Sequence, residues 1–382
     1  MNNKHTFLFT VLQFFLVTAL SLIISFLWMY LADSWDLLGD GIHYMVLYNE
    51  QVANSPFGYR ILTPFLARLL PWDALTNFTV ISLSCLSLTT GVFVLYFSKF
   101  NISKLSTIFL LFFWTTSFPF IYYGTTFIRA DAPMLLVIAA TILLSQHRVP
   151  PFILLTLFAA GTLFHEMVMI VIPALWLDKY FTGSLTGGSK YSYRELLLIT
   201  LGTILFYIVS RLTIPTNPSE VLHYLNVQSP IEMINHVLIY SEGFINHILR
   251  IYASFGPMFL YSLAYVLFIR KQYSDTMVYL ILLLITVVAT FLATDTLRVM
   301  AIISFAVIIY ASHFLLKTWE KGHRVITIVL LLLQVVYTSV VYLNLRTFEL
   351  SLEWNIVAAV ISIVTLLLCF WEIKRPISNN EV

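Results

Sequence analysis

The chain has 382 residues, of which 59% are hydrophobic and only 10% are charged, and its mean hydropathy is +0.88. A soluble chain carries roughly 25% charged residues, so this composition excludes a water-soluble domain. The net charge of +2, with Lys and Arg spread between apolar runs, sets nucleic-acid binding aside. Cys85 and Cys369 lie far apart in apolar stretches and predict neither a disulfide framework nor a zinc site.

Apolar runs follow one another along the whole chain. A backbone that faces lipid must satisfy its own hydrogen bonds, so runs of about 20 apolar residues are expected to be helices. The first run is too long for a signal peptide and is expected to remain as a span. The sequence predicts an all-α, polytopic transmembrane bundle of about twelve spans, or ten to twelve because three runs are short, in a single membrane domain over 1–382. The predicted spans are 7–31, 75–97, 105–124, 132–146, 150–164, 167–178, 196–211, 251–269, 277–294, 299–316, 325–344 and 354–371.

Basic residues decide whether residues 150–178 form one helix or a hairpin, because they favour the cytoplasmic side of a membrane. With a hairpin and a cytoplasmic N-terminus, 14 of the 21 basic residues lie inside, whereas a single helix leaves only 8 inside. The hairpin is therefore predicted, with both termini in the cytoplasm. All nine lysines then lie inside and the seven outer basic residues are all arginine, which binds carboxylates and phosphates through two-pronged contacts.

The first outer segment, residues 33–72, is the chief candidate for chemistry because it is long and carries ionisable residues throughout. Apolar positions recur at helical spacing over 42–52 and 61–70, which predicts two amphipathic helices at the membrane surface. Asp40 lies between two glycines just before the first of these helices. It is expected either to cap that helix or to act as a base or metal ligand.

Two short outer segments carry further candidates. Arg129 and Asp131 flank the start of the span 132–146, as a structural pair or as functional residues. His165 and Glu166 form the tip of the predicted hairpin. Ionisable groups at membrane depth are costly, so this pair is expected to hold a metal, a phosphate or a proton.

The later outer segments offer less specific signals. Asp295 and Arg298 are spaced to meet on one helical turn, either as a structural pair or as an arginine held toward phosphate. The long outer loop 212–250 leads into an amphipathic stretch over 231–252 with His236 and His247. This stretch suits a cover over a lipid-facing cavity or an ordinary interfacial helix.

Part of the first outer segment resembles a known family. Asp40 and Tyr44, followed by Ser55-Pro56-Phe57-Gly58-Tyr59-Arg60-Ile61-Leu62-Thr63-Pro64-Phe65-Leu66-Ala67, resemble the first outer loop of the GT-C superfamily of membrane glycosyltransferases. These enzymes are polytopic, take a polyprenyl-phosphate sugar as donor and keep an acidic motif in this loop. Outside residues 33–72 the likeness is one of layout: short spans after the third helix, and polar residues near 129–131 and at the hairpin tip.

The resemblance implies a GT-C-like fold and an inverting glycosyltransferase. It would move a sugar from a polyprenyl-phosphate donor to a lipid-linked or envelope glycan acceptor, at the outer face of a bacterial plasma (inner) membrane. Asp40 would deprotonate the acceptor hydroxyl, with Asp36 and Asp33 as alternatives. The candidates for binding the substrate and its phosphate are Arg60, Arg129, Asp131, His165, Glu166, Asp295 and Arg298.

The chain also departs from the family pattern. It has no strict Asp-X-Asp pair, and no soluble domain follows the last predicted span, so metal dependence and a protein acceptor are not carried over. No cofactor is certain; if a divalent metal binds, Asp40, His165 and Glu166 are its candidate ligands. The expected partners are the donor, the acceptor and membrane lipids, without nucleic acid.

Three other functions remain open from the sequence. Large outer loops with several arginines suit a lipid-linked glycan polymerase, whereas the early acidic motif favours a transferase of single sugars. A transporter or flippase binds at the midplane between internal repeats. The second half of this chain does not repeat the first, and its ionisable residues gather at one face. A structural membrane scaffold would need none of the candidate residues.

Overall fold

The computed structural model describes residues 3–31, 40–50, 57–98, 104–125, 129–181, 191–215, 230–241, 243–270, 272–291, 299–344 and 352–374. Over these residues the chain is helical and has no strand, so the all-α prediction is confirmed. Within the same residues, seven helices are long and apolar enough to cross a membrane, or up to nine if each of two bent pairs is one span. The chain is therefore a helical integral membrane protein, and the count of twelve spans stays a prediction.

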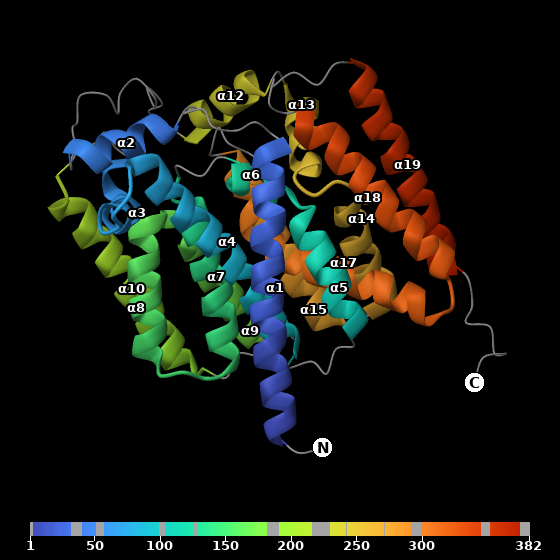
Figure 1. The fold of residues 1–382 in the computed structure, drawn as a ribbon, viewed down its shortest axis with the longest axis horizontal. Coiled ribbons are helices and arrows are strands. Elements are labelled where there is room, and N and C mark those ends of the chain that lie inside the picture. The colour runs from blue at the N-terminus through green and yellow to red at the C-terminus, as the bar shows by residue number, and fades with distance from the viewer. Residues whose placement is uncertain are drawn as a thin grey trace.

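The helices pack side by side in one bundle (Figure 1). In chain order they are α1 (Asn3–Leu31), α2 (Asp40–Glu50), η1 (Phe57–Tyr59), α3 (Leu62–Arg68), α4 (Ala74–Ser98), α5 (Lys104–Thr115), α6 (Phe118–Thr125), α7 (Asp131–Gln146), α8 (Pro151–Phe164), η2 (Glu166–Ile170), α9 (Val171–Phe181), α10 (Tyr193–Thr213), α12 (Pro230–Tyr240), α13 (Phe244–Ala253), α14 (Pro257–Ala264), η4 (Tyr265–Arg270), α15 (Tyr273–Thr290), η5 (Ala301–Ile303), α17 (Ser304–Glu320), α18 (Arg324–Asn344) and α19 (Leu352–Lys374).

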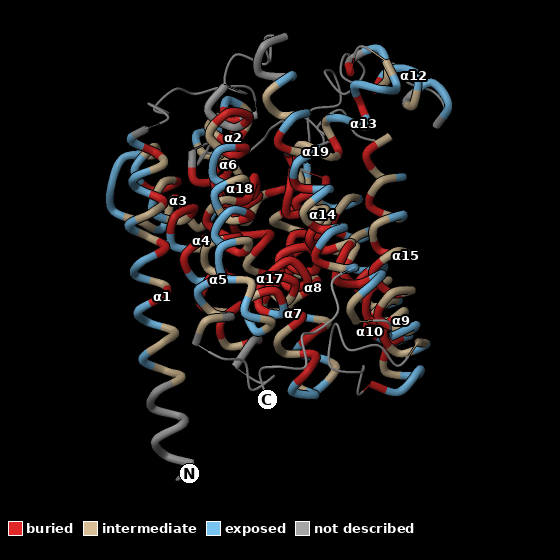
Figure 2. The backbone as a smooth tube through the Cα atoms, turned by 90° about the vertical axis from the view of Figure 1, so that its right-hand side faces the viewer, coloured by how far each residue is buried: buried red, intermediate tan, exposed pale blue. Residues whose placement is uncertain are grey.

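The centre of the bundle is buried, and its exterior is apolar. Helix α17 is buried along most of its length (Figure 2). The rings of Tyr261 and Phe314 stack against each other there, with centroids 5.8 Å apart. In contrast, α1, α10 and α19 expose large apolar side chains such as Phe15, Leu205 and Leu367. Exposed apolar surface on this scale is unfavourable in water and is satisfied by acyl chains.

The chain reverses direction between α8 and α9. The Tyr191 hydroxyl, just before α10, donates to the carbonyl of Val149, just before α8, over 2.7 Å. The last turn of α10 reaches the residues that follow α8, so these two helices run parallel. Helix α9 ends beside the start of α10, where the Lys179 ammonium lies 5.7 Å from the ring centroid of Tyr193. Helix α9 therefore runs antiparallel to α8, and residues 150–178 are not one helix.

Two predicted spans are bent rather than straight. The predicted span 105–124 is divided into α5 and α6, which meet at 53° around Ser117, with Pro119 in the first turn of α6, where a missing amide hydrogen is tolerated. The stretch before and within 251–269 is divided into α13 and α14, which meet at 78°. Gly256 makes this bend with a φ of +55°, and a side chain there would collide with the ring of Tyr337.

The two amphipathic helices predicted in the first outer segment are present as α2 and α3, joined through η1. The stretch 231–252, expected to be continuous, is instead two helices, α12 and α13. Gly243 separates them with a φ of +113°, and its amide donates to the carbonyl of Leu238 over 2.8 Å, which closes α12. Helices α2, α3, α12 and α13 lie at one end of the bundle, opposite to the start of α1 and the end of α19 (Figure 1).

Candidate functional site

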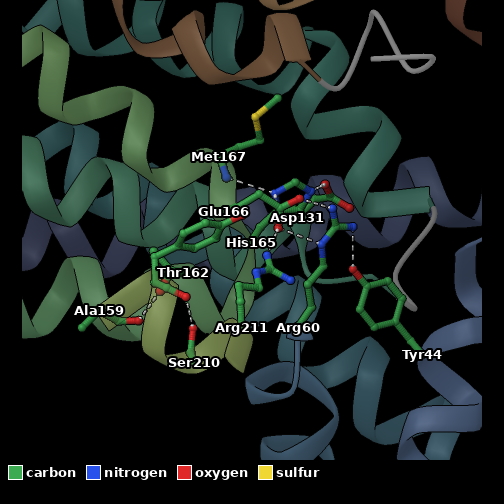
Figure 3. Close-up of polar contacts among 11 residues, drawn as sticks. Tyr44, Arg60, Asp131, Ala159, Thr162, His165, Glu166, Met167, Ser210 and Arg211 are labelled. Carbon is green, nitrogen blue, oxygen red and sulfur yellow. Dashed lines mark hydrogen bonds and ion pairs between the residues drawn. The ribbon is translucent and has the colours of Figure 1, made fainter. Parts of the chain in front are cut away.

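Glu166 lies at the centre of a group of charged side chains at the end of the bundle that carries α2 and α3 (Figure 3). Arg60 contacts both of its oxygens, Nη2 to Oε1 at 2.6 Å and Nε to Oε2 at 3.2 Å. Arg211 Nη2 donates to Oε2 over 3.2 Å. One carboxylate thus holds two guanidinium groups, one of them through a two-pronged contact. We refer to Tyr44, Arg60, Asp131, His165, Glu166 and Arg211 as the Glu166 cluster.

The local sequence explains how Glu166 reaches this position. Helix α8 ends when His165 adopts an extended conformation, and the His165 amide donates to the carbonyl of Gly161 over 2.8 Å. Gly161 allows the tip to pack closely, because a side chain there would come within 2.8 Å of Val168 and 2.9 Å of Val137. The tip is therefore held against α7, and Glu166 begins the short helix η2 with its side chain toward the arginines.

Aromatic side chains fix both guanidinium groups. The Arg211 guanidinium lies over the ring of Tyr59, 4.0 Å from its centroid, and over that of Tyr207 at 4.8 Å. Arg60 Nη1 donates to the Tyr44 hydroxyl over 3.4 Å. Such stacking is favourable and specific for a planar cation, which a lysine ammonium would not reproduce. The arginines are therefore held in defined orientations.

His165 and Asp131 form the second half of the cluster. His165 Nδ1 accepts a hydrogen bond from the backbone amide of Met167 over 3.2 Å, which places the proton of the neutral imidazole on Nε2. Nε2 lies 3.9 Å from Asp131 Oδ1, an ion-pair distance rather than a hydrogen bond. Asp131 is buried in the first turn of α7, where the helix N-terminus stabilises its negative charge.

The charge state of Glu166 follows from its neighbours. Burial raises the pKa of this carboxyl, but His165, Arg60 and the hydrogen bond from Arg60 outweigh that effect and hold the pKa well below its usual value of 4.5. Glu166 is therefore an anion at neutral pH. It serves as the counter-charge of two arginines and cannot supply a proton to a reaction.

The structure brings together four of the predicted site residues, Arg60, Asp131, His165 and Glu166, from three separate segments of the chain. Arg129 lies two residues before Asp131, and its Nη1 donates to the hydroxyl of Tyr122 over 2.7 Å. Asp40 is the first residue of α2, but its side chain lies outside the described residues. The predictions for three acidic residues and one arginine also fall outside the described residues: Asp33, Asp36, Asp295 and Arg298.

Two members of the cluster were not singled out as binding residues from the sequence. Tyr44 was noted only as part of the motif in the first outer segment. Arg211 was counted only among the seven arginines predicted to lie outside. A usable signal existed for Arg211. It ends a long apolar helix and follows Tyr207 by four residues, which puts the two side chains on one face of α10.

A metal at the hairpin tip finds little support in the described side chains. Among the described residues, no three His, Cys, Asp or Glu side chains are grouped so that they could hold a metal ion. The two oxygens of Glu166 are already in contact with Arg60 and Arg211. The metal prediction therefore rests on Asp40, whose side chain lies outside the described residues.

No known family model, curated protein or solved structure matches this chain. The fold and the site alone therefore define its class, which is that of a multi-span helical membrane protein. At one end of its bundle, paired arginines, a histidine and two acids meet from segments far apart in the sequence.

Proposed function

We propose that the chain is a membrane glycosyltransferase of the GT-C type. It transfers a sugar from a polyprenyl-phosphate donor to a lipid-linked or envelope glycan acceptor at the non-cytoplasmic face of a bacterial plasma membrane. The observation that carries the proposal is the meeting of Arg60 and Arg211 on Glu166, because Arg60 belongs to the very motif that resembles the superfamily.

The paired arginines suit a phosphate leaving group. When the glycosidic bond breaks, negative charge develops on the phosphate, and oriented guanidinium groups stabilise it. In the described structure Glu166 accepts the hydrogen bonds that these groups donate from their edges. A donor phosphate would share or replace those contacts, and the tyrosines beside Arg60 and Arg211 would keep the guanidiniums in place.

The apolar surface beside Arg211 suits a polyprenyl chain. In the last turns of α10, Arg211 is close in sequence to three exposed apolar residues: Leu205, Ile208 and Leu212. A lipid that lies along this face would bring its phosphate to the level of the Glu166 cluster. Burial of isoprene units against lipid and protein then contributes affinity without specific polar contacts.

Asp40 is the proposed base. It begins α2, one helical turn before Tyr44, whose hydroxyl accepts a hydrogen bond from Arg60. In the proposed step the acceptor oxygen forms a bond to the anomeric carbon as the bond from that carbon to the phosphate oxygen breaks. The phosphate departs with the electron pair, and the acceptor proton passes to the carboxylate, in keeping with an inverting transfer.

The test uses the purified full chain with a radiolabelled polyprenyl-phosphate sugar and a membrane extract as the source of acceptor. Transfer of label into a glycosidic linkage is expected, with a loss of about 100-fold or more in Asp40→Asn. Full activity of Asp40→Asn would refute its role as the base. Label that crosses the membrane with its linkage to phosphate unchanged would identify a carrier and refute the enzyme.

Arg211→Lys tests the arginine pair. It keeps the charge but loses the planar contact with Tyr59, so transfer is expected to fall by about tenfold or more. Arg324→Lys is the matched control, because Arg324 also lies over an aromatic ring, that of Trp319 at 5.5 Å, but at the opposite end of the bundle. Equal losses in the two variants would contradict a role of the Glu166 cluster in transfer.

A further inference from the structure

Helix α13 lies between the start of α14 and the end of α15, at the end of the bundle that carries α2 and α3 (Figure 1). At Gly256 the chain turns from α13 into α14, and the two helices meet at 78°. Helix α15 returns antiparallel to α14 and η4. Thr276, near its start, donates to the carbonyl of Val266 over 3.2 Å, and Tyr279, further along, has its hydroxyl 2.6 Å from that of Ser262. The start of α14 and the end of α15 therefore lie at one level of the bundle, and α13 lies beside both.

A buried histidine fixes α13 to the end of α15. Thr290 Oγ1 donates to the carbonyl of Val287 over 2.6 Å, so it accepts the hydrogen bond from His247 Nε2, which is 3.0 Å away. Nδ1 of the neutral imidazole then accepts from the Ser241 hydroxyl at 3.1 Å. The imidazole also packs on Phe291, with ring centroids 4.3 Å apart. These contacts hold the His247 side of α13 against the protein and set the direction of its other faces.

A second face of α13 is apolar and exposed. Its four side chains are between 40% and 75% exposed and have the i, i+1, i+4, i+5 spacing of one helical face: Phe244, Ile245, Ile248 and Leu249. We refer to these four residues as the α13 apolar face. Asn246 is exposed on a third face, which it shares with Arg250 four residues later. A helix with one apolar and one polar exposed face suits the boundary between a bilayer and water.

The end of α15 indicates what covers the α13 apolar face. Helix α15 is long and apolar enough over Tyr273–Thr290 to cross a membrane. An apolar crossing helix ends close to the level where acyl chains give way to head groups. Thr290, the last residue of α15, is the one that His247 contacts, and the ring of Phe244 stacks on that of Phe291 with centroids 6.1 Å apart. The α13 apolar face therefore lies at the depth of the outermost acyl carbons.

We infer that the α13 apolar face docks onto the bilayer itself, with its side chains among the acyl chains of the leaflet at this end of the bundle. An amphipathic helix of this kind lies about 5–10 Å into the boundary between head groups and acyl chains. Lipid and the His247 contacts hold different faces, so α13 ties the end of α15 to this leaflet. The inference shares no residue with the Glu166 cluster and does not depend on the proposed transferase activity.

The experiment places the fluorophore NBD on α13 in the full chain, reconstituted into phosphatidylcholine liposomes after replacement of Cys85 and Cys369 by alanine. Ile248→Cys and, separately, Leu249→Cys carry the label. Both labels are expected to emit at a shorter wavelength than NBD in water and to lose most of their fluorescence to lipids with a nitroxide just below the head group. A nitroxide near the end of the acyl chain should quench less, because the face lies only about 5–10 Å into the boundary. Iodide in the water should quench little.

Asn246→Cys is the matched control, because it carries the label on the polar face of the same helix. Its label is expected to be quenched by iodide and less by the lipid nitroxides. Strong iodide quenching at residues 248 and 249, or equal lipid quenching at all three positions, would overturn the inference. Labels at 248 and 249 shielded from both quenchers, or disulfide-linked dimers of unlabelled Ile248→Cys at a high ratio of lipid to protein, would also overturn it, because protein would then cover the face. Thermal unfolding of each labelled protein close to that of the wild type verifies that the fold is kept.

Discussion

Glu166→Gln is the most direct test of the paired arginines. The substitution keeps the shape of the side chain and removes its charge. It leaves the guanidinium of Arg60, with 8% of its side chain exposed, and that of Arg211, with 16% exposed, without their shared counter-charge. Two cations that water barely reaches would then face a neutral amide, so the folded state is expected to lose stability.

The magnitude follows from the burial of the three side chains. Removal of one partner of a buried ion pair costs about 3–5 kcal/mol. Glu166 itself is 24% exposed, so solvent screens part of the interaction, and the glutamine oxygen still accepts one hydrogen bond. We expect a loss of about 3 kcal/mol in the free energy of unfolding, at the lower end of that range. Chemical unfolding in detergent micelles, followed by tryptophan fluorescence, measures it.

Glu320→Gln is the matched control for this loss. Glu320 pairs with Lys317 at 2.7 Å, but about half of each side chain is exposed, 47% and 50%. Exposed pairs of this kind contribute about 0.5 kcal/mol or less. If Glu166→Gln and Glu320→Gln lowered the free energy of unfolding equally, the reasoning about the buried arginine pair would be refuted.

We also expect the Glu166 carboxylate to make the stability of the folded state depend on pH in the acid range. Burial raises the pKa of Glu166, but His165 and Arg60 outweigh this effect and hold the pKa well below its usual value of 4.5. A depressed pKa in the folded state gives stability that is present above the unfolded value and lost as the pH falls through the folded value. Between neutral pH and about pH 4.5 the contribution is intact, and below that range the wild type should lose stability faster than Glu166→Gln. Equal losses of stability on acidification in the wild type and in Glu166→Gln would contradict this expectation.

Three further predictions concern the rest of the fold. Gly256→Ala is expected to cost about 3–5 kcal/mol, because its positive φ strains the backbone and its side chain would also meet the ring of Tyr337. Gly243→Ala, with no atom within 4 Å, should cost about 1–3 kcal/mol from backbone strain alone, and thermal unfolding compares the two variants. Glu372→Gln, which removes a fully buried carboxylate paired with Lys321 at 3.1 Å, is expected to cost about 3 kcal/mol by the same assay. In a background without the native cysteines, Ser192→Cys should react with an impermeant thiol reagent only from the cytoplasmic side, and Trp72→Cys only from the outer side.

The sequence was informative where physical effects act locally. Apolar runs predict helices because lipid offers no hydrogen bonds, and the helices of the described residues follow those runs closely. The tip at His165 and Glu166 was located because two ionisable residues interrupt an apolar stretch. The bends at Ser117 and Gly256 were missed because the length and hydropathy of a run do not reveal whether the chain passes straight through it.

Only part of the site could be predicted from the sequence, because its contacts join residues that are far apart along the chain. Glu166 meets Arg60, which is 106 residues away, and Arg211, which is 45 residues away. Periodicity along the chain carries no information about such pairings. Asp178, at the end of the predicted span 167–178, and Asp275, just before the predicted span 277–294, are both buried in the structure. Their burial depends on packing between helices that are far apart in sequence.

The predicted outer location of the Glu166 cluster depends on the reversal between α8 and α9. If residues 150–178 were one helix, they would extend about 43 Å and carry the start of α10 to the end of the bundle opposite to Val149. The hydrogen bond of 2.7 Å from the Tyr191 hydroxyl to the Val149 carbonyl excludes that path. With the reversal in place, α8 and α10 both begin at the end of the bundle where α1 begins (Figure 1). The charge rule then predicts that the opposite end, where Glu166 holds Arg60 and Arg211, lies at the outer face.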